Sequence, residues 1–172
     1  MCRVESIKRL LIAVALFAAL SACHDPAAFR GSMPDLIPQQ VGDFKLAGQA
    51  TPLAPVAGKD AGDALRPTEG VNARYEAPGR GPIGVQVVNY PSAADAERAR
   101  KKMQENFENL QKGSQLGRSP KIDKEGKTVG QKLTVTDFAP GIHGVIWTNG
   151  SLLYVVTGDD LKAIEELEHG LP

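Results

Sequence analysis

The segment IHGVIWTNGSLLYVVT, residues 142–157, decides the fold of this 172-residue chain. Two apolar runs, 142–148 and 152–157, flank Asn149-Gly150, a dipeptide whose members both tolerate positive φ. The pattern predicts a β-hairpin with a tight turn. Trp147 and Tyr154 lie on its two arms, which favours cross-strand aromatic packing; the alternative is that the pair lines a ligand groove.

Outward from this hairpin, the chain alternates between strand and helix patterns. Gly158-Asp159-Asp160 precedes a helix with Leu161, Ile164 and Leu167 on one face and Gly170 at its end. Upstream, Leu133 and Val135 alternate with polar residues and predict a strand. Residues 121–129 predict a weak strand or a turn.

A second hairpin is expected around the turn at residues 78–81. Alternating apolar residues mark its arms, at 71–77 and 83–90. Ser92 and Asp95 then give a helix N-cap signature, and Gly113 marks the expected end of that helix. Its apolar stripe recurs at spacings of three and four residues: Ala96, Ala99, Met103, Phe107 and Leu110.

The order β-β-β-α-β-β-β-α predicts an α+β fold, with a mostly antiparallel sheet and both helices packed on one of its faces. We expect a single domain over residues 35–172. Within it, 13 of the 24 residues at 47–70 are Ala, Gly or Pro. Such a stretch is either a surface loop or a segment that orders on a partner.

The first 22 residues have the pattern of an export signal. Arg3, Lys8 and Arg9 precede an apolar run at 10–20 that is too short to span about 30 Å of hydrocarbon. Leu20-Ser21-Ala22-Cys23 follows directly and resembles the lipobox of bacterial lipoproteins. The resemblance implies cleavage before Cys23 and lipidation of Cys23, with residues 23–34 as a lipidated N-terminus and tether.

The alternative interpretation is an ordinary signal peptide with Cys23 as a structural thiol. Cys2 leaves with the signal, so the mature chain keeps one cysteine and forms no internal disulfide. In lipoproteins of this type, Asp directly after the lipidated cysteine favours inner-membrane retention. His24 stands there instead, which implies the periplasmic face of the outer membrane.

Composition and motifs exclude several function classes. The mature chain carries 17 basic and 19 acidic residues, a balance that argues against a nucleic-acid partner. We expect no cofactor and no metal site, because the three histidines lack ligand spacing. The basic residues Arg98, Arg100, Lys101 and Lys102 are expected on a solvated helix face.

The function predicted from sequence is that of a lipid-anchored envelope protein. We expect a non-catalytic binding or accessory module that acts on a membrane- or envelope-associated partner. One alternative is a small hydrolase or transferase that uses His143 with a carboxylate such as Asp137. Another is a stress-sensing domain, because residues 147–167 resemble extracytoplasmic domains of sigma-factor regulators.

Overall fold

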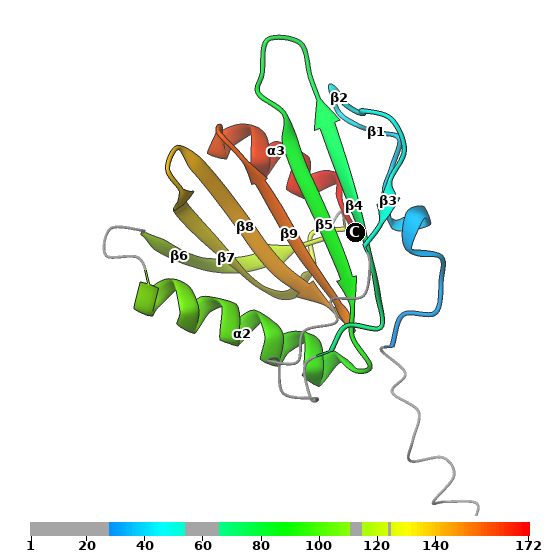
Figure 1. Cartoon of the computed structure of the whole chain (residues 1–172), viewed down its shortest axis with the longest axis vertical. Coiled ribbons are helices and arrows are strands. Elements are labelled where there is room, and N and C mark those ends of the chain that lie inside the picture. Colours follow the sequence, from blue (N-terminus) through cyan, green and yellow to red (C-terminus); the bar gives the residue numbers. More distant parts are fainter. Residues whose placement is uncertain (1–27, 54–65, 111–114, 124) are drawn as a thin grey trace, which may run out of the picture.

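A computed structural model describes residues 28–53, 66–110, 115–123 and 125–172. Within these ranges the chain forms one nine-stranded sheet, two α-helices and a short 3₁₀ helix (Figure 1). The elements are η1 (Met33–Leu36), β1 (Gln40–Val41), β2 (Phe44–Leu46), β3 (Thr51–Pro52), β4 (Glu69–Glu76), β5 (Ile83–Asn89), α2 (Ala93–Leu110), β6 (Leu116–Ile122), β7 (Thr128–Ala139), β8 (Ile142–Asn149), β9 (Leu152–Gly158) and α3 (Leu161–Gly170).

The sheet has the order β1-β2-β4-β5-β9-β8-β7-β6, with β3 paired to β4, and every pair is antiparallel. Hairpin β4–β5 joins the meander β6–β9 through the pairing of β5 with β9. The predicted α+β class and the mostly antiparallel sheet are confirmed. None of the helices described here is long and apolar enough to cross a bilayer.

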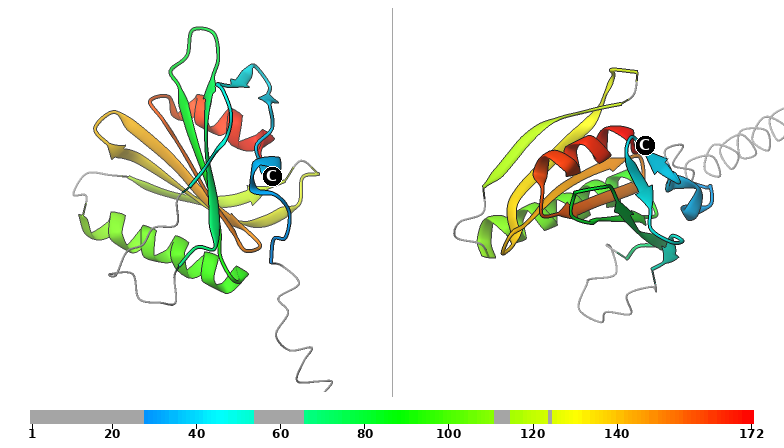
Figure 2. Two further views of the ribbon diagram at one scale, coloured as in Figure 1. Left: turned by 45° about the vertical axis from the view of Figure 1, so that its right-hand side comes forward. Right: turned by 90° about the horizontal axis from the view of Figure 1, so that it is seen from above.

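The two helices lie on opposite faces of the sheet, which corrects the prediction that they share a face (Figure 2). In β8, Trp147 faces the core under α3, whereas its neighbour Ile146 packs with Ala99 of α2. In β9, Tyr154 likewise faces the core under α3, and its neighbour Val155 faces the core under α2. The apolar runs of these strands are nearly continuous because both faces are buried.

The turn between β8 and β9 differs from the expected one. Asn149 pairs with Leu152, so the two central residues are Gly150 and Ser151. Gly150 has a φ of 57°, whereas Ser151 does not have a positive φ. Positive φ at the first central residue alone is typical of a type II′ turn, which suits glycine there. The shift by one residue leaves Ser151 fully buried.

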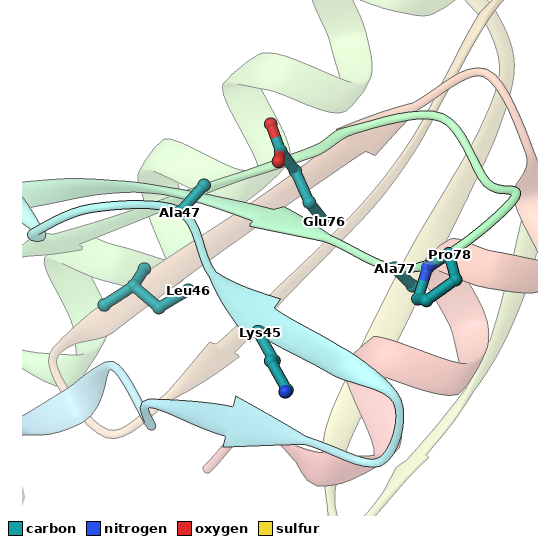
Figure 3. Close-up of a pocket in the computed structure, with 6 residues that line it drawn as sticks. All are labelled: Lys45, Leu46, Ala47, Glu76, Ala77 and Pro78. Carbon is teal, nitrogen blue, oxygen red and sulfur yellow. The ribbon is translucent and has the colours of Figure 1, made fainter.

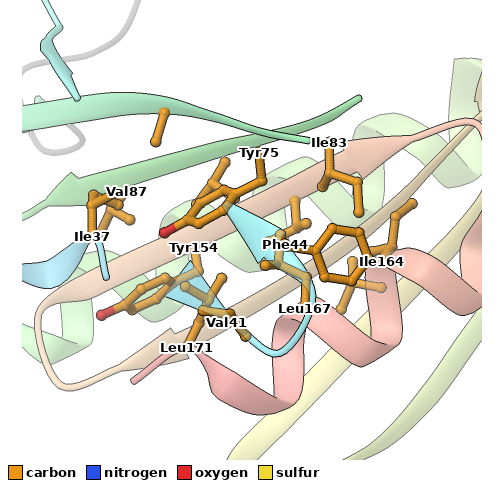
Figure 4. Close-up of a cluster of buried hydrophobic side chains, with 14 of the residues drawn as sticks. Ile37, Val41, Phe44, Tyr75, Ile83, Val87, Tyr154, Ile164, Leu167 and Leu171 are labelled. Carbon is orange, nitrogen blue, oxygen red and sulfur yellow. The ribbon is translucent and has the colours of Figure 1, made fainter. Parts of the chain in front are cut away.

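The larger core lies between the sheet and α3 (Figure 4) and includes residues of the predicted tether. Met33 is buried in this core, and Phe29 packs against it. Residues 29–34 therefore belong to the folded body, and the predicted tether is shorter than expected. Sequence periodicity missed this segment because Pro34 and Pro38 interrupt any regular pattern.

Three further boundaries differ from those predicted. The weak strand or turn predicted at 121–129 is displaced: strand β6, which contains Pro120 and forms an edge of the sheet, covers Leu116–Ile122, and β7 begins at Thr128. The 47–70 stretch includes β3, and β4 already begins at Glu69, while residues 54–65 lie outside the described part. The predicted N-cap of α2 is confirmed, because the Asp95 amide donates to Ser92 Oγ at 3.1 Å. Gly113, its expected end, also lies outside the described residues.

Candidate functional site

The chain enters the folded body beside the β8–β9 turn, where a small polar cluster holds its first described residues. The Phe29 amide donates to Ser151 Oγ at 2.8 Å, and the Ser151 hydroxyl donates to Asn89 Oδ1 at 2.7 Å. Asn89 Nδ2 in turn donates to Glu69 Oε1 at 3.2 Å. Ser151 and Asn89 are buried, so these hydrogen bonds fix the position of Phe29.

An apolar hollow of about 420 Å³ opens next to this entry point. Phe29 and Leu36 come from the N-terminal segment, and Tyr154 comes from β9. The full lining is Phe29, Leu36, Asn149, Gly150, Leu152, Tyr154 and Pro172. The lining is mostly apolar, but the hollow is open to solvent, unlike the enclosed clefts that are usual for small-molecule sites.

Tyr154 is fully buried, and its hydroxyl is one of two buried side-chain polar atoms without a hydrogen-bond partner among the described residues. The other is Nε1 of Trp147. Burial raises the pKa of Tyr154, so the phenol keeps its proton and remains a donor. Tyr75, also labelled in Figure 4, differs: its hydroxyl donates to the Pro38 carbonyl at 2.6 Å.

Trp147 and Tyr154 stack with ring centroids 4.7 Å apart and planes 7° from parallel. The predicted cross-strand packing of this pair is therefore confirmed. Trp147 is fully buried, with Lys121 Nζ 4.8 Å from its ring centroid. The groove interpretation holds only in part: Tyr154 lines the hollow, whereas Trp147 lies behind it in the core.

Beside Trp147, one carboxylate of α3 joins two lysines of the meander. Glu168 Oε1 lies 2.6 Å from Lys121 Nζ, and Oε2 lies 2.9 Å from Lys132 Nζ. Lys121 also donates to the Glu168 carbonyl at 3.0 Å. Burial alone raises the pKa of Glu168, but the hydrogen bonds from both lysines outweigh burial and hold that pKa below its ordinary value. The arrangement ties α3 to β6 and β7.

Sequence reasoning missed Glu168, although a signal existed. Glu168 stands four residues after Ile164, which places its side chain on the buried face of α3. A carboxylate on an apolar stripe is expected to have a cationic partner. Asn89 and Ser151, which hold Phe29 in the polar cluster, show no comparable pattern in the sequence, because their pairing depends on a contact between distant parts of the chain.

The structure brings His143 close to Asp137, but the interaction joins the imidazole to the backbone amide of Asp137 and not to its carboxylate. The Asp137 amide donates to His143 Nδ1 at 3.3 Å, and Asp137 has a φ of 56° at the irregularity between β7 and β8. The hydrogen bond from the amide occupies one ring nitrogen of His143.

Asp160, which precedes α3, accepts hydrogen bonds from the Lys162 and Ala163 amides and so caps that helix.

The four basic residues predicted on one solvated face of α2 do not share a single environment. Arg100 is buried and pairs with Glu97 through two hydrogen bonds of 2.9 and 2.7 Å. Arg98 is exposed and pairs with Asp95. Lys101 and Lys102 are exposed. The expectation of a solvated face is therefore wrong for Arg100.

A second hollow lies between β2 and the end of β4 and is shown in Figure 3. Lys45 and Glu76, which are register partners on these strands, lie on its walls with Leu46, Ala47, Ala77 and Pro78. Its lining includes neither a hydroxyl nucleophile nor an imidazole. No group of three or more His, Cys, Asp or Glu side chains that could hold a metal occurs in the described ranges.

Comparisons with known proteins add little to this geometry. No protein-family model matches the chain, and no curated protein matches its sequence. Among solved structures, the chain is similar to a protein described as a GTP binding regulator from Thermotoga maritima. The TM-score is 0.49 at 16% identity, over 86% of this chain and 92% of the other. A similarity at this level carries no functional argument.

Cys23, the predicted lipidation site, lies outside the described residues.

Proposed function

We propose that this chain is a lipid-anchored protein of the bacterial envelope, with a folded body that is a non-catalytic binding or accessory module. The observation that carries the proposal is the position of Leu20-Ser21-Ala22-Cys23 directly after the apolar run at 10–20. Lipid on Cys23 explains a lone mature cysteine in an exported chain. One acyl chain gives marginal membrane affinity, so stable anchoring requires more than one.

The short connection between Cys23 and the folded body supports a function close to the membrane. Phe29 is held by Ser151 and follows Cys23 by six residues, so the two Cα atoms lie no more than about 20 Å apart. The anchored end of the domain therefore stays near the bilayer surface. Such confinement raises the effective concentration of the module near a membrane-associated partner.

The non-catalytic part of the proposal is supported by what the chemically versatile side chains already do. His143 accepts a backbone hydrogen bond, Glu168 neutralises buried lysines, and Asp160 caps a helix. Each of these groups has a structural partner that explains its position. The alternative of a hydrolase that uses His143 with Asp137 has no comparable support.

The anchor is tested by expressing the full chain in a bacterium and measuring the mass of its N-terminal peptide. We expect cleavage before Cys23 and a mass increase that corresponds to acyl groups. Cys23→Ala should abolish the increase and release the protein from the membrane fraction, whereas Cys2→Ala, within the leader, should change neither. An unmodified Cys23 in protein released by osmotic shock would refute the anchor.

The choice of membrane is tested separately. In a Gram-negative host we expect the protein in the outer-membrane fraction after density separation. His24→Asp should move it toward the inner-membrane fraction. Equal distribution of wild-type and variant would show that His24 does not direct the sorting, while leaving the anchor itself in place.

The binding role is tested by mild cross-linking of the lipidated protein in intact cells. We expect a discrete envelope partner that is lost with Cys23→Ala, because release from the membrane removes the local concentration. Recovery of the protein without any partner, under conditions that preserve known envelope complexes, would count against an accessory role.

A further inference from the structure

We infer that α2 docks on the anionic headgroups of the bilayer through the exposed ammonium groups of Lys101 and Lys102. The inference rests on the proposed lipid anchor at Cys23, which supplies the tether, and adds to it which side of the folded body faces the membrane. It follows from the place of α2 in the molecule, from the charges along this helix and from the short connection between Cys23 and Phe29.

The start of α2 lies beside the point where the chain enters the folded body. Ser151 joins the two, because its Oγ accepts from the Phe29 amide at 2.8 Å and its carbonyl accepts from the Tyr90 amide at 2.9 Å. Tyr90 precedes Ala93, the first residue of α2, by three residues, so their Cα atoms are at most about 11 Å apart.

The arrangement of the whole molecule agrees with these contacts. Figure 1 shows α2 and the start of the described chain at one end of the molecule and the β4–β5 turn at the opposite end. A tether that leaves from the N-terminal side therefore holds α2 near the bilayer and the β4–β5 turn away from it.

The first part of α2, residues 93–102, carries two positive charges in excess. Each acidic residue of this part is paired with an arginine three residues later, Asp95 with Arg98 and Glu97 with Arg100. Lys101 and Lys102 are exposed, and no ion pair between described residues includes either of them. Their ammonium groups are therefore available to an anionic surface.

The second part of α2, residues 103–110, has the opposite character. It contains no basic residue after Lys102. Glu105 is exposed, and Glu108 accepts a hydrogen bond from Arg118 of β6 at 3.0 Å. The positive charge of the helix is therefore concentrated in the part that follows the chain entry, which the tether keeps closest to the bilayer.

The attraction suits a tethered protein and not a free one. Lys102 lies nine residues into α2, about 14 Å along the helix axis from its start. An anionic leaflet favours contact with each nearby lysine about fivefold, so two lysines favour it about 25-fold. This is weaker than one acyl chain, which by itself gives marginal binding. The tether of at most about 20 Å already supplies a high effective concentration, so the same attraction is enough to favour one orientation.

The orientation is measured with a fluorescent dye on a single added cysteine. This cysteine is the only free thiol, because Cys2 leaves with the leader and Cys23 carries lipid. Ala94→Cys places the dye at an exposed position in the first turn of α2, and Pro78→Cys places it at an exposed position in the β4–β5 turn. The lipidated protein is inserted into phosphatidylcholine vesicles, with or without phosphatidylglycerol, that carry a nitroxide quencher on a headgroup.

We expect phosphatidylglycerol to increase quenching of the dye at Ala94→Cys about twofold or more, and to leave the dye at Pro78→Cys unquenched. Salt at about 1 M, which shortens the Debye length to about 3 Å, should cancel the increase.

Two double variants connect the quenching to α2. Lys101→Gln with Lys102→Gln should cancel the increase, because the preference of about 25-fold is lost. Lys45→Gln with Lys162→Gln is the matched control, since it removes the same charge from exposed lysines of β2 and α3, and the increase should persist.

The outcomes separate this inference from the proposed function. Acylated Cys23 with equal quenching in both kinds of vesicle, or at both dye positions, would overturn the docking and leave the anchor intact. Equal loss of quenching in the two double variants would show that net charge and not α2 is responsible, and would also overturn it. Binding to purified peptidoglycan that depends on Lys101 and Lys102, without an effect of phosphatidylglycerol, would overturn lipid as the occupant. An unmodified Cys23 would remove the tether and overturn the docking together with the anchor.

Discussion

Replacing Glu168 with glutamine removes the one negative charge that Lys121 and Lys132 share beneath α3. Glu168 and Lys121 have side chains that are only 2% exposed, and Lys132 is 13% exposed. Glutamine has nearly the same shape and keeps one acceptor oxygen. The substitution therefore tests the charge of the cluster without creating a cavity.

The size of the effect follows from distance and burial. At an effective dielectric constant of 20, two unit charges about 2.6 Å apart attract by roughly 6 kcal/mol before desolvation is counted. Loss of one partner of a buried pair costs about 3–5 kcal/mol, because the remaining charge stays buried without compensation. We expect Glu168→Gln to lower the free energy of unfolding by about 3–5 kcal/mol.

The assay is equilibrium urea unfolding of the mature chain, followed by circular dichroism. Glu165→Gln, on the same helix but outside the cluster, is the control and should change stability by less than about 0.5 kcal/mol. The triple variant Lys121→Met, Lys132→Met and Glu168→Leu should recover most of the lost stability, since apolar replacement of a buried ion pair is often neutral. A loss below about 1 kcal/mol for Glu168→Gln would refute the reasoning.

Three other changes test the packing described above. The pKa of Glu168 is held below its ordinary value of 4.5, so its contribution to stability is complete above pH 4.5 and is lost as the pH falls through the lowered pKa. The free energy of unfolding, measured from pH 7 to 2, should show this loss in wild type and a smaller loss in Glu168→Gln. Tyr154→Phe should raise the free energy of unfolding by about 1 kcal/mol, whereas Tyr75→Phe should lower it by about 1–2 kcal/mol, because among the described residues the Tyr75 hydroxyl has an acceptor and the Tyr154 hydroxyl has none; equal effects in urea unfolding would contradict this. Gly170→Ala should lower the free energy of unfolding by about 1–3 kcal/mol, since an added Cβ would clash with Val41 Cγ1, and an unchanged melting temperature would show that this contact relaxes.

Much of the fold follows from local sequence patterns. Alternation in β4 and β5, the apolar stripe of α2 and the cap at Asp160 each determine an element from its own residues. The opposite placement of the helices was also encoded, since Val145, Ile146 and Trp147 are consecutive and all fully buried. Three consecutive apolar residues in a strand indicate burial on both faces.

The rest depends on contacts between distant residues. Strand β6 reads as polar, with Arg118, Ser119 and Lys121, because it is an edge strand whose lysine is buried by Glu168 of α3. The hydrogen bond that holds the Phe29 amide requires Ser151, which is 122 residues away in the sequence. The hollow lined by Phe29 and Leu152 likewise combines residues from distant parts of the chain, so no local sequence pattern predicts it.

Pro120 has a consequence for how the sheet meets neighbouring molecules. An open strand at the margin of a sheet is a template for edge-to-edge aggregation. At one margin of this sheet, β6 contains a proline, which lacks an amide donor; at the other, β1 has only two residues. Both margins therefore resist the addition of a neighbouring chain, so molecules at high local concentration, such as the proposed anchor would produce, would not join their sheets into fibres.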